Sequence, residues 1–137
     1  MNRLAIRLIA MLNVSHRSCG LDPEPLVGLL GGGQDVEFHE VSPSGVVAFV
    51  GDYCLGAWPD DEIRIAAPAA HRVLSARLRE RGFTRHMVHP LNFRSVKLTR
   101  KMGAEPIGVD ADGFVHYVLR SERFPHHGQE VPAAPAA

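Results

Sequence analysis

The side chains best suited to moving a proton stand at two places in the chain. Asp61 and Glu62 are adjacent carboxylates, and His89 is an imidazole whose usual pKa is close to neutral pH. Each group could accept a proton from a substrate. Each also has a purely structural interpretation, the carboxylates as the solvated start of a strand and the histidine as a half-buried packing residue. The sequence leaves both interpretations open.

The charges are divided between the two halves of the chain, although the net charge is zero. Residues 20–62 contain nine acids and no Lys or Arg, whereas residues 64–101 contain ten cations and one acid, Glu80. A basic segment of this kind predicts an anionic partner. The alternative is a solvated basic face that the acidic half balances in the folded domain.

Two patterns could suggest a metal site, and neither fits one. His86 and His89 are three residues apart in a strand-like run, so their side chains point to opposite faces. Asp110-x-Asp112-Gly113 is similar to the start of a calcium loop, but Ser121 stands at loop position twelve, where a Glu is required. We therefore expect no metal cofactor.

Composition bounds the class of protein. The chain has 137 residues, of which 45% are hydrophobic and 22% charged, as in a globular domain. No apolar run approaches the roughly 18 residues of a membrane span, and Arg7 interrupts the apolar N-terminal run. Cys19 and Cys54 lack CxxC spacing, which favours a reduced, cytoplasmic location. We expect one domain at residues 1–124, followed by a flexible tail at 125–137.

The first half of the chain reads as helices followed by strands. Apolar spacing predicts a helix near residues 4–12, with a strand as the alternative. An N-cap Asp and a following Pro predict a short helix at 23–30, and a glycine joint follows at 31–33. Three short runs rich in β-branched and aromatic residues then predict strands, and a Gly51-Asp52 turn joins the last two. They are VEFHEV, GVVAFV and YCLGAW.

The second half alternates strands with helices, which predicts a mixed α/β sheet with helices packed on its faces. The expected elements are a strand at 62–68, a helix at 69–81 ended by Gly82, a strand at 84–91, a helix capped by Asn92 and ended by Gly103, and a hairpin of strands at 105–109 and 114–120. In the helix capped by Asn92, the residues expected to share one face are Leu91, Ser95, Leu98 and Met102.

This order, together with a small set of residues, resembles the GNAT family of acetyl-CoA-dependent N-acetyltransferases. The likeness covers roughly residues 45–120 and is closest to the short, divergent members encoded by phages and prophages. The residues that carry it are Gly82-Phe83, the strand end near Val88, Asn92, Ser95, Leu98 and Gly103.

The resemblance implies a fold and a cofactor site. The fold would be a mostly antiparallel central sheet, flanked by helices and splayed between its fourth and fifth strands, here 62–68 and 84–91. The pantetheine arm of acetyl-CoA would lie in that gap, and its pyrophosphate at the start of the next helix, near residues 67–72. The implied cofactor-binding residues are Ile63, Ile65, Ala67, His71, Arg72, Asn92 and Ser95.

The sequence departs from the family at two motifs, the phosphate-binding loop and the position of the general acid. The phosphate loop Arg/Gln-x-x-Gly-x-Gly/Ala would fall at Glu62, Ile65 and Ala67, which supply neither the leading Arg/Gln nor the first glycine. The tyrosine that protonates the departing thiolate is replaced by Thr99, whose hydroxyl is a far weaker acid. Ala104 stands where an aromatic residue usually follows the helix.

The resemblance implies acetyl transfer to an amine on a small molecule or a protein. In that mechanism Glu62, with Asp61, or His89 would accept the amine proton, and Thr99 would occupy the acid position. The alternative is a catalytically idle protein on the same scaffold, acting as a phage structural component or binding and inhibiting a host protein. Nucleic-acid binding by the basic segment ranks last, because aromatic residues are not interleaved with the cations.

Overall fold

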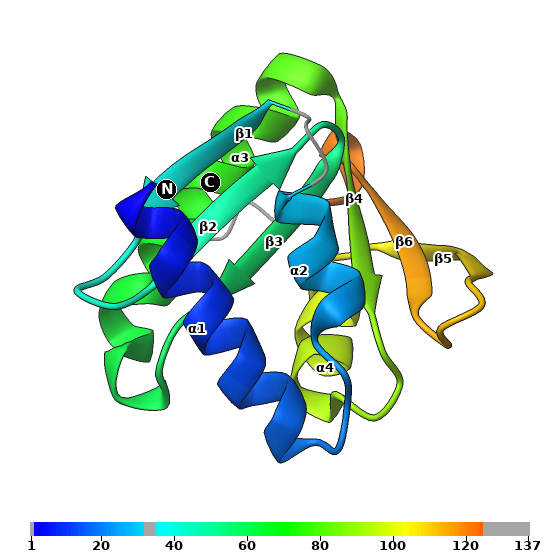
Figure 1. Cartoon of the computed structure of the whole chain (residues 1–137). Helices are drawn as coiled ribbons and strands as arrows, with labels where there is room; N and C mark the ends of the chain where they lie inside the picture. The colour runs from blue at the N-terminus through cyan, green and yellow to red at the C-terminus, as the bar shows by residue number, and fades with distance from the viewer. Residues whose placement is uncertain (1, 32–34, 125–137) are drawn as a thin grey trace.

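The computed structural model describes residues 2–31 and 35–124, and within them six strands form one sheet in the order β1-β2-β3-β4-β6-β5 (Figure 1). Most of the predicted joint at 31–33 and the predicted tail at 125–137 lie outside the described residues. The helices are α1 (Arg3–Ser18), α2 (Glu24–Leu30), η1 (Asp60–Glu62), α3 (Ile63–Arg81), α4 (Phe93–Lys101) and η2 (Ser121–Arg123). The strands are β1 (Val36–Glu40), β2 (Val46–Val50), β3 (Tyr53–Ala57), β4 (Phe83–Val88), β5 (Glu105–Val109) and β6 (Val115–Arg120).

The sheet consists of two antiparallel parts that meet in a parallel contact. Strands β1, β2 and β3 pair antiparallel, as do β4, β6 and β5. Strands β3 and β4 run parallel and, in the described residues, share one register pair, Tyr53 with Arg85. Beside it the Arg85 N–H donates to the Asp52 carbonyl over 2.7 Å. Beyond this contact the strands diverge toward their C-terminal ends (Figure 1). The mixed, mostly antiparallel sheet expected from the sequence is confirmed.

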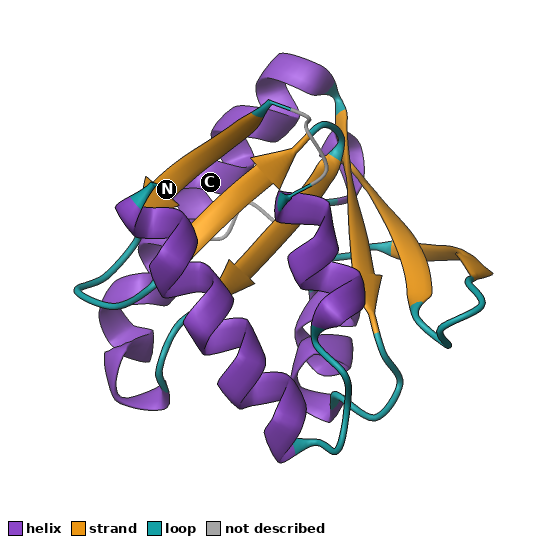
Figure 2. Cartoon of the chain, in the orientation of Figure 1, coloured by secondary structure: helices purple, strands orange, loops and turns teal. Residues whose placement is uncertain are grey.

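Helices cover both faces of the sheet (Figure 2). On one face Leu8 and Leu12 of α1 and Leu26 of α2 pack against Val46, Ala48 and Val50. On the other face α3 packs through Ala66, Leu74 and Leu78 against Val47 and Phe49. Because side chains alternate along a strand, the apolar run of β2 supplies both cores. A fully buried side chain of this size contributes about 1.5–3 kcal/mol.

The predicted strand at 62–68 is wrong, because these residues begin α3. The alternation of Ile63 and Ile65 suggested a strand, yet both side chains are exposed, by 47% and 59%. The buried positions Ala66, Leu74 and Leu78 instead follow helical spacing over three turns. Acidic residues in the preceding turn favour a helix N-terminus, and Pro68 is accommodated inside α3.

The predicted helix ends are confirmed. Gly82 and Gly103 both adopt positive φ, at 87° and 94°, Gly82 directly after α3 and Gly103 two residues after the end of α4. The Asn92 side chain caps α4 by accepting the Ser95 N–H at 3.4 Å. Of the residues expected to share one face of α4, Leu98 is 45% exposed, whereas Thr99 is the buried residue, at 4%. The helix is therefore rotated by about one residue, or 100°, relative to the apolar pattern.

Replacing the two helix-ending glycines should destabilise the domain unequally. A Cβ at Gly82 meets open space, so Gly82→Ala incurs only the positive-φ strain of about 1–2 kcal/mol. A Cβ at Gly103 would lie 2.5 Å from the Arg123 carbonyl oxygen, so Gly103→Ala should cost more. Urea unfolding of both variants measures the difference, and equal losses would contradict the packing of η2 against this turn.

His86 on β4 is a buried histidine. It is 7% exposed and its Nε2 shares a 2.8 Å hydrogen bond with the Thr84 hydroxyl. Burial lowers the pKa of His86 to about 4, so the imidazole is neutral in the folded protein at neutral pH.

Acidification should therefore destabilise the fold through His86. The unfolded chain takes up this proton near pH 6.5 and the folded one only near pH 4, so stability falls as the pH drops between these values. Between pH 7 and 5 the expected loss is about 2 kcal/mol. Urea midpoints at the two pH values measure it. His86→Asn should flatten this dependence, whereas His39→Asn, on the rim of the sheet, should leave it in place.

Candidate functional site

The gap between β3 and β4 is the candidate site. Because the two strands are parallel, their C-terminal ends lie at the same edge of the sheet, and α3 and α4 begin there. An ion pair between Arg94 of α4 and Asp60 of η1 links these two helix starts. Strand alternation turns the backbone groups of Cys54 and Gly56 to the same side as the Asp52 carbonyl, which faces β4. Gly56 is an exposed residue of β3.

Glu62, a predicted base, performs a structural task. Its Oε1 accepts the Ser42 hydroxyl at 2.5 Å and the Ser44 N–H at 2.8 Å, which fastens the β1–β2 turn to the start of α3. The hydrogen bond from Ser42, followed by that from the Ser44 backbone, lowers the pKa of the Glu62 carboxyl. A carboxylate stabilised in this way is a weak base. Its neighbour Asp61 is exposed.

The residues predicted for phosphate binding are not gathered at a helix start. Ile63 and Ile65 project into solvent from the first turn of α3, and Ala67 is half-buried within the helix. His71 and Arg72 lie eight and nine residues beyond Ile63, which is about 12–14 Å along the axis. The expected anion site at 67–72 is therefore wrong as a helix N-terminus, because α3 starts earlier. The true start carries acids in place of the expected cations.

The predicted residues after β4 divide into accessible and inaccessible ones. Asn92 and Ser95 stand at the first turn of α4, at the edge of the gap. Thr99 is buried, so its hydroxyl is closed to a ligand at the surface. His89 follows β4, and its Nδ1 accepts the Leu91 N–H at 3.1 Å, which occupies one ring nitrogen in a turn.

His89 also belongs to a ring cluster on the α1 side. Its ring meets Phe114 edge-on, with centroids 5.3 Å apart, and His16 of α1 stacks on the same phenyl ring at 6.3 Å. Burial lowers the pKa of His16, and the nearby His89 adds to that effect. The cluster packs the end of α1 against β6, which supports the structural interpretation of His89.

A hydrogen-bonded chain that the sequence did not predict crosses the sheet beside the gap. The Tyr53 hydroxyl lies 2.9 Å from His116 Nδ1, and His116 Nε2 lies 2.8 Å from Asp110 Oδ2. Tyr53 belongs to β3 and His116 to β6, so the chain spans the intervening strand β4. The side chains of His116 and Asp110 are 22% and 28% exposed, so solvent reaches both.

Asp110 is held rigidly at the β5–β6 turn. Its Oδ1 accepts the N–H groups of Asp112 and Phe114, at 2.9 and 3.1 Å, while Oδ2 faces His116. Burial opposes its ionisation, but the hydrogen bonds from His116 and the two backbone N–H groups outweigh that effect and lower the pKa of the Asp110 carboxyl. The chain therefore ends in a fixed carboxylate.

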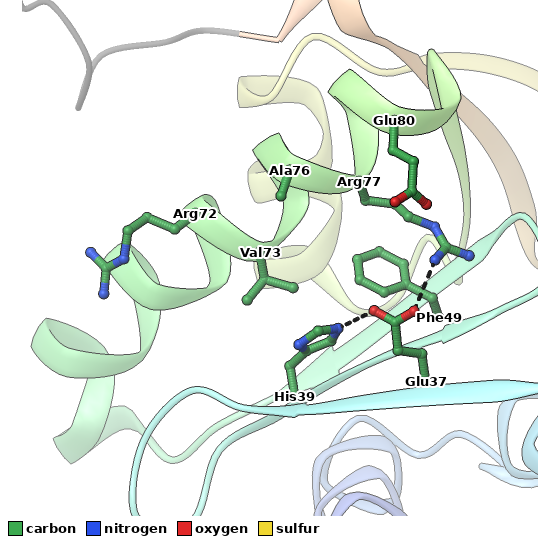
Figure 3. Close-up of a pocket in the computed structure, with 8 residues that line it drawn as sticks. All are labelled: Glu37, His39, Phe49, Arg72, Val73, Ala76, Arg77 and Glu80. Atoms are coloured by element: carbon green, nitrogen blue, oxygen red, sulfur yellow. Dashed lines mark hydrogen bonds and ion pairs between the residues drawn. The ribbon is translucent and has the colours of Figure 1, made fainter.

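A hollow of about 300 Å³ lies between β1 and α3 (Figure 3). Glu37 accepts hydrogen bonds from Arg77 at 3.3 Å and from His39 at 2.5 Å, and the Arg77 guanidinium lies over the Phe49 ring. Arg72 extends away from this group (Figure 3). The polar groups at its centre thus bind one another, which fastens β1 to α3. The other residues that line it are Val73, Ala76 and Glu80.

Part of the charge division is balanced inside the fold. Arg77 pairs with Glu37 and Arg94 with Asp60, so cations of the second half meet acids of the first. The prediction of a basic face balanced by the acidic half therefore holds for these pairs. Such exposed pairs contribute little stability, about 0–1 kcal/mol each.

Comparisons with known proteins add no assignment. No family model, curated protein or solved structure matches the chain. Within residues 2–31 and 35–124 no three His, Cys, Asp or Glu residues are grouped as metal ligands would be. Over the same residues, no helix has the length and apolar character needed to cross a membrane.

The structural role of Glu62 leads to a stability prediction. Glu62→Ala should lower the urea midpoint at pH 7 more than Asp61→Ala, because it removes the anchor of Ser42 and Ser44. The folded pKa of Glu62 is lowered, so its contribution is present above about pH 4.5 and is lost as the pH falls through the folded value. The difference between the variants should shrink in acid, and equal midpoints at pH 7 would contradict this role.

Proposed function

We propose that the protein is a GNAT-like acyltransferase that holds a pantetheine thioester, as in acetyl-CoA, in the gap between β3 and β4 and transfers the acetyl group to an amine. The observation that carries the proposal is the parallel contact at Tyr53 and Arg85, beyond which the strands diverge. The resemblance noted in the sequence implied a gap between the fourth and fifth strands. The strand expected at 62–68 does not form, and the strand beside β4 is β3. We therefore assign the gap to β3 and β4.

The exposed backbone of β3 supplies the chemistry that the thioester needs. The N–H of Gly56 is directed toward β4 by strand alternation, where it can donate to the thioester carbonyl and stabilise the negative charge that develops on its oxygen. Gly56 carries no Cβ, and one built there would contact Val47 and Trp58 on the face of the sheet. Asn92 and Ser95 at the start of α4 border the same gap. Acyl transfer depends mainly on such positioning, so it asks for few reactive side chains.

The acidic residues before α3 determine the affinity that we expect for the coenzyme A diphosphate. Asp60 and Asp61 stand in the turn before the helix, whereas Arg64 and Arg94 are the cations of that region, the latter already paired with Asp60. Carboxylates at a helix N-terminus stabilise the helix and repel a second anion there. We therefore expect weak binding of the coenzyme A diphosphate, with Arg64 and Arg94 as its countercharges.

A second candidate is a catalytically idle scaffold that binds another protein. It is favoured by large apolar side chains exposed on the helix starts beside the gap, together with the neighbouring acids. These side chains are Ile63, Ile65, Leu91 and Phe93, and Phe93 is 75% exposed. The phage structural component or host-protein inhibitor considered from the sequence belongs to this class.

Thermal unfolding with millimolar acetyl-CoA distinguishes the two candidates. A ligand at about 100 times its Kd stabilises by about 2.7 kcal/mol, which raises the midpoint by several degrees. Gly56→Val should weaken the rise by crowding β3, because a Cβ at Gly56 already lies 3.4 Å from Val47 and 3.8 Å from Trp58. Gly108→Val, on the exposed edge strand β5, is the matched control and should retain it. No rise in the unaltered protein at saturating ligand would reject the acyltransferase and favour the idle scaffold.

A further inference from the structure

We propose that Tyr53, His116 and Asp110 form a proton relay, in which the Tyr53 hydroxyl takes the proton of the attacking amine. Tyr53 would be the catalytic residue that touches the substrate, while His116 and Asp110 position and polarise it. This inference rests on the proposed acyl transfer in the β3–β4 gap. It assigns the base to residues other than Glu62, His89 and Thr99.

The distances fix the direction of the relay. The Asp110 carboxylate can only accept, so at 2.8 Å it requires a hydrogen on His116 Nε2. A neutral imidazole with its hydrogen on Nε2 has a lone pair on Nδ1, which accepts the Tyr53 hydroxyl at 2.9 Å. The Tyr53 oxygen therefore keeps its lone pairs for a substrate, while its own proton points toward a base.

Tyr53 stands on β3 at the parallel contact, and its hydroxyl reaches over β4 to His116 of β6. Tyr53 is the β3 member of the pair with Arg85, so it stands where the two strands begin to diverge. Alternation puts Tyr53 on the same face as Leu55, which packs in the core beneath α1 and α2.

The reaction returns Tyr53, His116 and Asp110 to their starting protonation states. As the amine nitrogen bonds to the carbonyl carbon, its proton passes to the Tyr53 oxygen and the tyrosine proton passes to His116 Nδ1. Asp110 then stabilises the imidazolium across the bond to Nε2. The carbon–sulfur bond breaks, the leaving thiolate takes a proton back through Tyr53, and His116 returns to its neutral form. The products are an amide and a free thiol.

Two features distinguish the hydrogen-bonded chain of Tyr53, His116 and Asp110 from ordinary structural hydrogen bonds. Asp110 is held from both of its oxygens, by backbone N–H groups and by the imidazole, so the carboxylate is oriented before any ligand arrives. The polar chain also crosses a strand of the sheet to join β3 to β6, although the solvent that reaches His116 and Asp110 could satisfy these groups separately. A pre-oriented chain of this kind is what proton transfer requires.

The first test examines the relay without measuring acyl transfer. Long-range ¹H–¹⁵N spectra of the imidazole rings report which nitrogen of His116 carries the hydrogen. We expect the Nε2–H form in the unaltered protein and a mixture of both forms in Asp110→Asn. A mixture or the Nδ1–H form in the unaltered protein would overturn the relay.

The second test measures transfer from acetyl-CoA to cadaverine, spermidine, lysine amide and a lysine-containing peptide. Tyr53→Phe should slow transfer by about 10²- to 10⁴-fold while leaving the thermal shift with acetyl-CoA intact. Tyr117→Phe, a buried tyrosine of β6, is the control and should transfer normally. Transfer by Tyr53→Phe within threefold of the unaltered rate would overturn the relay. An unaltered protein that binds acetyl-CoA but acetylates none of these amines would overturn the relay and leave the cofactor site standing, whereas failure to bind would overturn both.

Discussion

The parallel contact between β3 and β4 is the constraint on which the rest of the structure depends. The Asp52 carbonyl and the Arg85 N–H, 2.7 Å apart, join two antiparallel halves of the sheet at one end and leave them apart at the other. The neighbouring strands β1, β2 and β3 are held by continuous ladders along all five residues of β2. The strands therefore open where their backbone groups lack a partner strand, and unpaired backbone groups beside exposed surface are available to a ligand.

The helices maintain this opening from both faces. The α1–α2 core and the α3 core lie on opposite sides of β2, and each also includes a residue in or next to the second half of the sheet, Phe114 and Leu119 respectively. Two side-chain contacts also join the halves, the exposed ion pair of Arg94 with Asp60 at the helix starts and the hydrogen bond of Tyr53 with His116 across β4. The same links bring titratable groups to the gap, so the scaffold and the proposed chemistry share their residues.

Local signals in the sequence predicted much of this fold. Gly82, Gly103 and Asn92 were identified because positive φ and helix capping depend on single residues. The strand at 62–68 failed because two isoleucines at alternate positions outweighed a helical pattern that becomes visible only when Ala66 is read together with Leu74. The first turn of α3 is exposed, so it has no apolar face from which hydrophobic periodicity could predict a helix.

The candidate site was harder to predict, because its contacts are long-range. Asp110 and His116 flank a hairpin turn, so their proximity follows from the register of β5 and β6. The contact of His116 with Tyr53 depends on β6 entering the sheet between β4 and β5, which no local pattern encodes. Glu62 was taken for a base because its partners, Ser42 and Ser44, are about twenty residues away.

Backbone amide chemical shifts during a titration with acetyl-CoA test the central claim most directly, namely that a thioester binds in the gap. We predict that the largest changes fall at Cys54 and Gly56 of β3, at the C-terminal end of β4, and at Asn92 and Ser95 of α4. Changes confined to the hollow between β1 and α3, at Glu37 and Arg77, or no changes at millimolar ligand, would contradict it.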